Sequence, residues 1–375
     1  MKKMIGVISL SILMLFNCSC QKSKAAKINE IFIPIVGNQE YFEADPNFLN
    51  GVEMAVREFN EKYESRGYIL KIQKFYDNSN YETGVSIATQ LASDPKVTAI
   101  INAQDFNILN ATAEILNNGN KIVLMPYGSD ESVLKKGYQN VFRNTFGATD
   151  MGRAMGQYVI NKGFSRIVVA HSDTEFENII AKSFGATLLN TQAKIVDYVP
   201  KIMNQDDFNK FYDRWSLLSA DCIIITQYDY AKAFEINKMV REKGKNMAVV
   251  GDFSFDIQGQ ISLYKDYVDG IVIPVLFPVT YSDKLNGFQA KYNQTYGEKP
   301  NLWASHGYDS VRMIADTAIK LESIKSEVIT KALKSPEGYD GLSGKIIFDS
   351  EGNFIGQETQ LKKLINGKFE LMNTK

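Results

Sequence analysis

The chain has few of the residues from which metal sites and disulfide frameworks are built. Its 375 residues include two histidines, His171 and His306, and three cysteines. Two histidines exclude sites with several imidazole ligands, and most serine- or cysteine-triad chemistry would need one of them as its base. Only Cys222 lies far from the N-terminus, and its apolar neighbours predict a buried thiol without a disulfide partner. We therefore predict no metal, no cofactor and no catalytic residue.

An excess of charge of one sign is also missing. Lys plus Arg number 42 and Asp plus Glu number 43, so the formal net charge is −1. A protein that binds nucleic acid carries a basic patch to neutralise phosphates, and this composition contains no such excess. We expect no nucleic acid among the partners of the chain.

Common enzyme motifs are absent as well. The sequence has neither a G-x-S-x-G elbow nor a G-x-G-x-x-G fingerprint. The segment Gly338–Lys345 is similar to a phosphate loop, but its first glycine is one position too early and Ile346 replaces the Ser or Thr that would hold Mg²⁺. We interpret it as a turn. A hydrolase with His171 as its base is the least favoured function.

The N-terminus has the pattern of an export signal. Lys2 and Lys3 precede an apolar run over 4–16, which is shorter than the ~20 residues that cross a bilayer. The run ends at Cys18 and Cys20, and this arrangement resembles a bacterial lipoprotein signal. We predict a signal over 1–20, a lipid on Cys18 or on Cys20, and anchoring to a bacterial membrane on its periplasmic or extracellular face. An ordinary secreted protein is the alternative.

Predicted strands and helices alternate along the rest of the chain. Apolar runs predict strands at 31–36, 69–76, 97–101, 121–125, 166–170, 194–199, 222–226 and 247–250. Between them, apolar residues recur at helical spacing, as at Val52, Ala55, Val56 and Phe59. Strands that alternate with helices form βαβ units around a mostly parallel sheet. The fold class is therefore α/β.

The two halves of this pattern repeat each other. A strand, an aspartate, a helix, a glycine and a second strand follow in that order in each half. The aspartate and glycine are Asp105 and Gly119 in the first half, and Asp229 and Gly244 in the second. This repeat predicts two lobes of similar construction. Open parallel sheets bind ligands beyond the carboxyl ends of their strands, so two facing lobes would share one binding site.

Several segments in order have the character of a known family. They are the strand and helix from Ile33 to Asn60, Tyr76-Asp77-Asn78, the stretch Tyr138–Arg143, Tyr308-Asp309-Ser310-Val311 and Gly341-Leu342-Ser343-Gly344. Together they resemble the type I periplasmic binding proteins, specifically the branched-chain amino-acid (Leu/Ile/Val) solute-binding family, over nearly the whole mature chain.

This resemblance implies two doubly wound parallel-sheet lobes joined by three crossovers. The first lobe would comprise 28–143 plus 275–348, and the second 144–274 plus 349–375. Members of the family close such lobes around a ligand by hinge rotation.

The resemblance also assigns ligand contacts in the first lobe. Gly128 and Ser129 stand where the family binds the ligand's carboxylate, although Ser129 or Asp130 could equally cap a helix. Asp105, followed by Phe106, replaces a serine that is frequent in the family. Its carboxylate either meets an ammonium or cationic side chain of the ligand or caps a helix.

The second lobe supplies the remaining contacts. Phe176 and Tyr228 correspond to pocket aromatics, with core packing as the alternative, and Asp252 approximates the acid that binds the ligand's ammonium. A correspondence displaced by one or two residues would bring in the nearby Ser254 and Asp256 in place of Asp252. Tyr41, in the loop expected after the first strand, could cover the site.

Taken together, the resemblance implies a non-enzymatic binding lipoprotein. It would capture an amino acid or analogue between its lobes and deliver the ligand, as a monomer, to the permease subunits of an ABC transporter. The alternative on the same fold is a sensory binding protein that reports ligand occupancy to a regulator.

Overall fold

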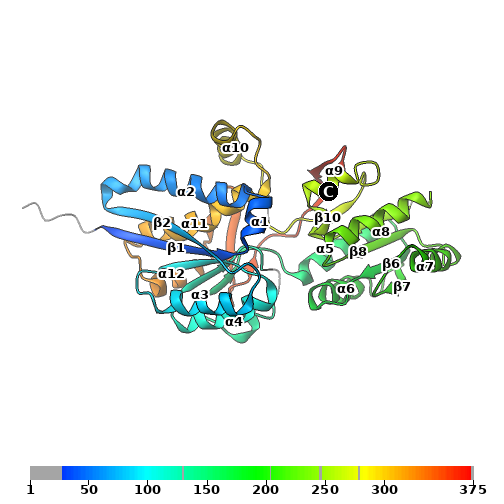
Figure 1. Ribbon diagram of the computed structural model, residues 1–375, viewed down its shortest axis with the longest axis horizontal. Helices are drawn as coiled ribbons and strands as arrows, with labels where there is room; N and C mark the ends of the chain where they lie inside the picture. The colour runs from blue at the N-terminus through cyan, green and yellow to red at the C-terminus, as the bar shows by residue number, and fades with distance from the viewer. Residues whose placement is uncertain (1–27, 129–130, 203, 245–246, 278, 373–375) are drawn as a thin grey trace, which may run out of the picture.

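Apolar runs form the central strands of two sheets in the computed structural model, which describes residues 28–372 except 129–130, 203, 245–246 and 278. Two α/β lobes lie side by side along the longest axis of the molecule (Figure 1). All eight predicted strands are present, with ends that differ from the prediction by at most two residues. The predicted α/β fold is confirmed.

The first lobe is built on a parallel sheet in the order β2-β1-β3-β4-β5. Its strands are β1 (Asn29–Gly37), β2 (Tyr68–Tyr76), β3 (Ala99–Ala103), β4 (Ile122–Met125) and β5 (Val141–Arg143). Its helices are α1 (Gln39–Ala44), α2 (Asn47–Tyr63), α3 (Tyr81–Ser93), α4 (Phe106–Asn118), α10 (Asp283–Tyr296), α11 (Leu302–Lys320) and α12 (Ser326–Leu333).

Side chains of this sheet alternate between two cores, because successive residues of a strand point to opposite faces. Ile31, Ile33 and Ile35 of β1 are buried with α2 and α11. Phe32 and Val36 are buried on the other face, with α3 and α4. Figure 1 shows these helix pairs on opposite sides of the sheet.

The second lobe repeats this design. Its sheet has the order β15-β14-β10-β9-β8-β6-β7, in which β7-β6-β8-β9-β10 corresponds strand for strand to β2-β1-β3-β4-β5. The strands are β6 (Arg166–His171), β7 (Lys194–Val199), β8 (Cys222–Thr226), β9 (Ala248–Gly251), β10 (Val272–Pro274), β14 (Leu361–Ile365) and β15 (Lys368–Leu371). The helices are α5 (Ala148–Asn161), α6 (Glu175–Thr187), α7 (Gln205–Leu217), α8 (Tyr230–Glu242) and α9 (Gln258–Leu263).

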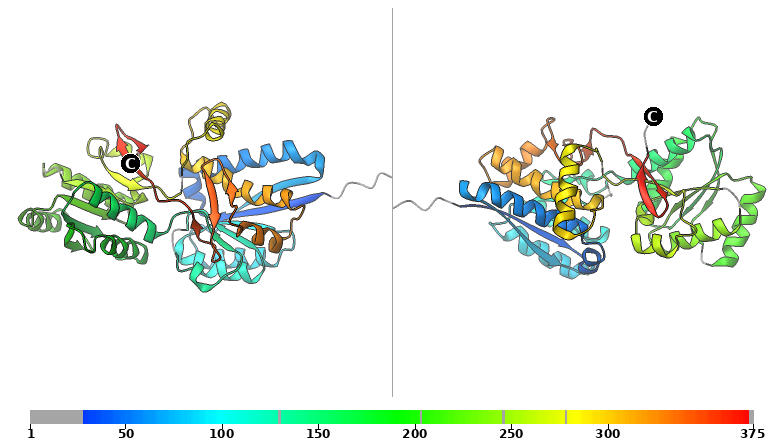
Figure 2. Two further views of the ribbon diagram at one scale, coloured as in Figure 1. Left: turned by 180° about the vertical axis from the view of Figure 1, so that it is seen from behind. Right: turned by 90° about the horizontal axis from the view of Figure 1, so that it is seen from above.

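Three chain segments connect the two lobes, and hydrogen bonds join them to one another. The amide of Arg143 donates to the carbonyl of Gly352 at 2.9 Å, and the amide of Phe146 donates to the carbonyl of Leu276 at 2.7 Å. Two edge-to-face aromatic pairs, Phe142–Phe348 and Phe146–Phe354, reinforce the contact between the first and third segments. Figure 2 shows the C-terminal segment passing from the first lobe to the second.

A small antiparallel sheet lies beside the third connection. It contains β11 (Tyr339–Asp340), β12 (Lys345–Phe348) and β13 (Phe354–Ile355), so the phosphate-loop lookalike forms the turn of a hairpin, as predicted. The sequence assigned β13 to the second lobe, whereas its pairing with β12 places it beside the first.

Candidate functional site

The loops at the carboxyl ends of the strands hold the predicted site residues. In each sheet the strand order reverses direction between two neighbours, β1 and β3 in the first lobe and β6 and β8 in the second. Loops that diverge at such a switch point leave a crevice in which open α/β sheets bind ligands. At corresponding positions, Tyr41 and Phe176 lie in the helices that follow β1 and β6, and Asp105 and Tyr228 lie in the loops after β3 and β8.

Tyr41 is a first-lobe residue whose pKa is affected by groups of both lobes. It lies on helix α1 and not in the expected loop, because Asn38 accepts a hydrogen bond from the amide of Glu40 and starts the helix directly after β1. The Tyr41 side chain is 57% exposed. Partial burial raises the pKa of its phenol, and Asp105, Tyr228 and Tyr230 raise it further. Loops of both lobes therefore come close at this point.

Asp105 occupies the N-cap position of α4 without capping it. Its side chain makes no capping hydrogen bond to the described residues of the helix. Asp229, at the equivalent position before α8, does accept a hydrogen bond from the amide of Lys232. Of the two predicted roles of Asp105, helix capping is therefore wrong, and its carboxylate is available for other contacts.

A buried polar network fixes the turn that carries Asp105 and Phe106. The amide of the Gln104 side chain donates to Asp77 at 2.7 Å and its oxygen accepts from the hydroxyl of Thr112 at 2.6 Å. Asn102 adds a donor to Thr112 at 3.1 Å. Phe106 begins α4 and is half-buried.

Gly128 follows β4 in a tight, buried turn. Its amide donates to the carbonyl of Met125 at 3.4 Å, and its carbonyl accepts from the Thr145 hydroxyl in the first connection at 3.0 Å. A Cβ at this position would lie 2.8 Å from that of Met125, so only glycine fits without a shift. Ser129 and Asp130 lie outside the described residues.

An aromatic cluster supports this turn. Tyr127 stacks on Trp303 with ring centroids 4.5 Å apart, and Trp303 packs against Phe277. His306 stacks on Phe277 and hydrogen-bonds the carbonyl of Pro126 at 3.1 Å, and burial lowers the pKa of its imidazole to about 3. His306 is thus a neutral structural residue.

On the second lobe, Phe176 lies in the first turn of α6, where it packs partly against the core, and Tyr228 follows β8. The Phe176 ring is half-buried, with its centroid 5.5 Å from that of Phe253, an exposed residue that the sequence did not single out. Tyr228 is 72% exposed, and its amide donates to the Ser172 hydroxyl oxygen at 2.9 Å. Core packing, the alternative for Tyr228, is therefore wrong.

Asp252 is the buried acid that follows β9. Its side chain is 1% exposed and accepts a hydrogen bond from the amide of Ser254 at 2.9 Å. Burial raises the pKa of Asp252 to about 6, although hydrogen bonds from Ser254 and Gln227 oppose the rise. Asp256, the other candidate acid, is paired with Lys362, which leaves Asp252 as the available carboxylate.

Glu177, which the sequence did not single out, is a second buried acid beside Asp252. It lies in the first turn of α6, is 2% exposed, and its Oε2 has no hydrogen-bond partner among the described residues. Burial and the nearby Asp252 raise the pKa of Glu177 to about 7. In sequence it has the position of an ordinary acidic residue at a helix start, so no local signal distinguished it.

Hydroxyl groups near the carboxyl ends of β6 and β8 are unpaired as well. The side-chain oxygens of Thr174 and Thr226 are buried and have no hydrogen-bond partner among the described residues. Buried polar atoms without partners are costly, and ordered water or a polar ligand can supply the missing hydrogen bonds.

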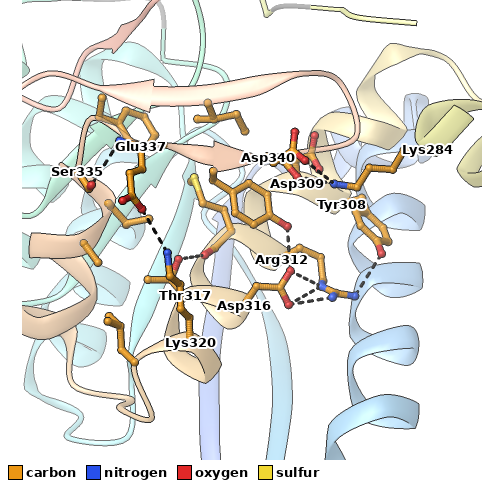
Figure 3. Close-up of a pocket in the computed structure, with 18 residues that line it drawn as sticks. Lys284, Tyr308, Asp309, Arg312, Asp316, Thr317, Lys320, Ser335, Glu337 and Asp340 are labelled. Atoms are coloured by element: carbon orange, nitrogen blue, oxygen red, sulfur yellow. Dashed lines mark hydrogen bonds and ion pairs between the residues drawn. The ribbon is translucent and has the colours of Figure 1, made fainter. Parts of the chain in front are cut away.

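A separate cavity of about 620 Å³ lies between α11, α12 and the β11–β12 hairpin (Figure 3). Its polar groups are already paired, with Arg312 bound to Asp316 at 2.8 Å and the Tyr339 hydroxyl donating to Asp316 at 2.9 Å. The described residues that line it include no predicted site residue. It therefore offers no unpaired group to a polar ligand.

The groups considered for enzyme chemistry have structural positions. Cys222 is buried in β8, as predicted, and burial raises the pKa of its thiol. His171 Nδ1 lies 3.0 Å from the carbonyl oxygen of Ser172. Over the part of the chain that the structure describes, no three His, Cys, Asp or Glu side chains are grouped to hold a metal. No described helix is long and apolar enough to span a membrane.

Comparison with known proteins places this geometry in context. A family model described as "Periplasmic binding protein" matches residues 33–368. The Leu/Ile/Val-binding protein of Escherichia coli is 21% identical over 231 residues, which are 61% of this chain and 60% of the relative. The chain thus aligns with about three fifths of the length of that relative.

Solved structures match over more of the chain. An ABC transporter substrate-binding protein from Desulfitobacterium hafniense, in complex with Leu, has a TM-score of 0.83 and 25% identity, covering 92% of this chain and 100% of that one. LivJ of Streptococcus pneumoniae, in complex with isoleucine, has a TM-score of 0.77 and 21% identity, covering 92% and 99%. The latter likeness concerns the fold alone.

Proposed function

The chain belongs to the periplasmic binding protein family, and we propose that it captures an amino acid or close analogue between its lobes and delivers it to an ABC transporter. The resemblance to the branched-chain amino-acid binding family, predicted from sequence, is confirmed. The D. hafniense protein was solved in complex with leucine, which supports an amino-acid-like ligand here.

One observation carries the proposal. Two sheets whose first five strands follow corresponding orders carry the candidate residues beyond the carboxyl ends of their strands, and Tyr228 and Tyr230 of the second lobe raise the pKa of Tyr41 of the first. Groups from two rigid bodies around one space can enclose a ligand when the connecting segments rotate. The connecting segments are suited to that role because they link the lobes without a helix passing between them.

We assign complementary roles to the two lobes. Gly128 and Ser129 after β4 would bind the ligand's carboxylate, and Asp252 after β9 would bind its ammonium group. These loops occupy equivalent places, since β4 and β9 are the fourth strands of corresponding orders. Tyr41, Asp105, Phe106, Phe176 and Tyr228 would surround the rest of the molecule.

Ligand screening tests this function. Thermal denaturation of the purified protein would be followed with the twenty amino acids, short peptides, amides and sugars. A ligand at 100 times its Kd stabilises the folded state by about 2.7 kcal/mol, so a binding amino acid raises Tm. If sugars or nucleosides raise Tm and no amino acid does, the ligand assignment is wrong.

Assays in living cells distinguish a role in transport from a role in sensing. If the protein serves a transporter, deletion of its gene abolishes uptake of the radiolabelled ligand at low concentration. Unchanged uptake together with a lost transcriptional response to the ligand would favour the sensory alternative.

We also propose that the exported protein is lipid-anchored and monomeric. Cys18 and Cys20 lie outside the described residues, and the proposal depends on the signal pattern that precedes them. Metabolic labelling with an alkyne fatty acid should be lost in one of the two variants Cys18→Ser and Cys20→Ser, and that variant identifies the lipidated cysteine. Labelling that persists in the double variant would indicate a secreted protein without this anchor.

A further inference from the structure

Glu177 gives the proposed binding site a second buried negative charge. We infer that the ligand is a basic amino acid or a related diamine, whose second cationic group binds Glu177 while Asp252 binds the first. This inference depends on the proposed ligand-binding function and names the class of ligand.

One carboxylate oxygen of Glu177 lacks a hydrogen-bond donor within the described chain. Glu177 is 2% exposed and its Oε2 has no hydrogen-bond partner among the described residues. A buried carboxylate oxygen without a donor costs more free energy than an unpaired neutral group, so it is expected to have a partner in the working state of the protein. A ligand cation supplies that donor.

The balance of charge between the two acids and the ligand favours a ligand with two cationic groups. Asp252 raises the pKa of Glu177, and no described lysine or arginine is among the groups that shift it. Ionising two neighbouring buried carboxylates is costly, and a ligand cation offsets that cost. A neutral amino acid brings one ammonium group, which Asp252 alone would satisfy, whereas a basic one brings two cations.

Position connects Glu177 to the ligand contacts. Phe176, a predicted contact, precedes it, and Ser172 both hydrogen-bonds Glu177 and accepts the amide of Tyr228. The acid thus belongs to the same loop cluster as the second-lobe aromatics, close to the carboxyl ends of β6, β8 and β9.

The surrounding aromatic groups fit a cationic ligand. The side chains beyond the carboxyl ends of the strands include the half-buried or exposed aromatics Tyr41, Phe176, Tyr228, Tyr230 and Phe253. The face of an aromatic ring attracts ammonium and guanidinium groups, and the same rings pack on the methylene stem of a basic side chain. Asp105, which does not cap its helix, adds a third carboxylate on the opposite lobe.

The alternative is a structural acid that stays protonated. In that case Glu177 would support the backbone of α6 without touching the ligand. A neutral Gln would then replace it with no change in ligand preference, which makes the two possibilities separable by experiment.

Isothermal titration calorimetry at pH 7.5 decides between them. Lysine, arginine, cadaverine, leucine and phenylalanine would be titrated into the wild-type protein, Glu177→Gln and Glu175→Gln. Glu175 is the matched control, because it lies in the same helical turn but is exposed. Circular dichroism and Tm would establish that each variant is folded.

We expect lysine or arginine to bind the wild type at least 30-fold more tightly than leucine, as removal of one partner from a buried charge pair typically costs a factor of this size. Glu177→Gln should lose about 30-fold in affinity for the basic ligand and change less than threefold for neutral amino acids. Glu175→Gln should bind like the wild type.

Other outcomes overturn the inference. Tighter binding of leucine or phenylalanine than of any basic ligand would refute a dicationic ligand and leave the proposed amino-acid function intact. Equal loss of affinity for every ligand in folded Glu177→Gln would assign a structural role to Glu177. If no amino acid or amine binds the wild type, the proposed function itself is wrong.

Discussion

Glu177 and Asp252 are carboxyl groups whose environment favours the protonated form. Both are nearly fully buried, and the pKa rises from 4.5 to about 7 for Glu177 and from 3.8 to about 6 for Asp252. Burial disfavours the charged form of an acid, and a neighbouring carboxylate adds repulsion. In the ligand-free protein, ionisation of these two acids therefore lowers the free energy of unfolding as pH rises.

The first prediction concerns stability against pH. Because the folded-state pKa of Glu177 is raised, its contribution to stability is complete below about pH 4.5 and is lost as pH rises through 7. The loss is on the order of 3 kcal/mol. Without ligand, Glu177→Gln should be more stable than the wild type at pH 8 and show a flatter dependence between pH 5 and 8, measured by urea denaturation.

Asp252 titrates in the same direction, so part of the pH dependence should remain in Glu177→Gln. The exposed control Glu175→Gln should keep the full wild-type slope. If Glu177→Gln keeps the wild-type slope as well, the side chain of Glu177 is hydrated in solution and not buried as described.

The second prediction compares two aspartates at equivalent positions. Asp229 caps α8, so Asp229→Ala should lower the free energy of unfolding by about 1 kcal/mol. Asp105 makes no capping bond to the described residues of α4, so Asp105→Ala should stay within about 0.5 kcal/mol of the wild type but alter ligand affinity. Equal destabilisation of the two variants would contradict the uncapped geometry.

The capping and burial of individual residues could not be predicted from the sequence. Asp105 and Asp229 precede helices in the same pattern, and only the hydrogen bonds distinguish them. Glu177 gave no signal, because its burial and the effect of Asp252, 75 positions further along the chain, arise only from the tertiary fold. The residues that follow strands were predictable, since strand ends can be located from the apolar runs.

At the scale of elements, strong hydrophobic periodicity was sufficient for the βαβ units. The central strands are buried on both faces and therefore consist of continuous apolar runs, such as Cys222–Thr226. Weak elements escaped prediction. Helix α1 has six residues and begins through a local cap at Asn38, and β11 and β13 have two residues each. Such short segments acquire structure from their neighbours and not from their own pattern.

The third prediction concerns helix packing. Helices α2 and α11 approach so closely that a Cβ on Gly51 would lie 1.9 Å from the carbonyl oxygen of Ala304. A backbone atom cannot rotate away, so Gly51→Ala should destabilise the protein by about 2 kcal/mol, despite the better helix propensity of alanine.

Gly287→Ala provides the matched control for this packing. Gly287 lies in α10 and is exposed, and a Cβ added there would have no described heavy atom outside its own helical surroundings within 4 Å. Alanine there should stabilise the protein by about 0.5 kcal/mol or more through helix propensity alone. Thermal or urea denaturation of both variants tests the difference, and equal effects of the two substitutions would contradict the close approach of α2 and α11.

At the scale of the whole molecule, the repeated strand order has a mechanical consequence. Each lobe has its own sheet and helices, so each can move as one body, while the hydrogen bonds between the connections keep the three segments together. Rotation about those segments would change the separation of Tyr41 from Tyr228. The sequence predicted the two lobes through their internal repeat, but the mutual contacts of the connections depend on residues as distant as Arg143 and Gly352.

The last prediction follows from this design. If a ligand bridges the lobes, saturation with it should shift the population toward the closed arrangement, because only that arrangement lets both sets of loops contact the ligand. Small-angle X-ray scattering should then show a smaller radius of gyration with ligand than without, whereas a non-binding sugar at the same concentration should leave it unchanged. Asp252→Asn, folded but weakened in binding, should need more ligand for the same decrease. A radius that stays constant while calorimetry reports a saturated site would mean that the ligand binds one lobe alone, and hinge closure would have to be abandoned.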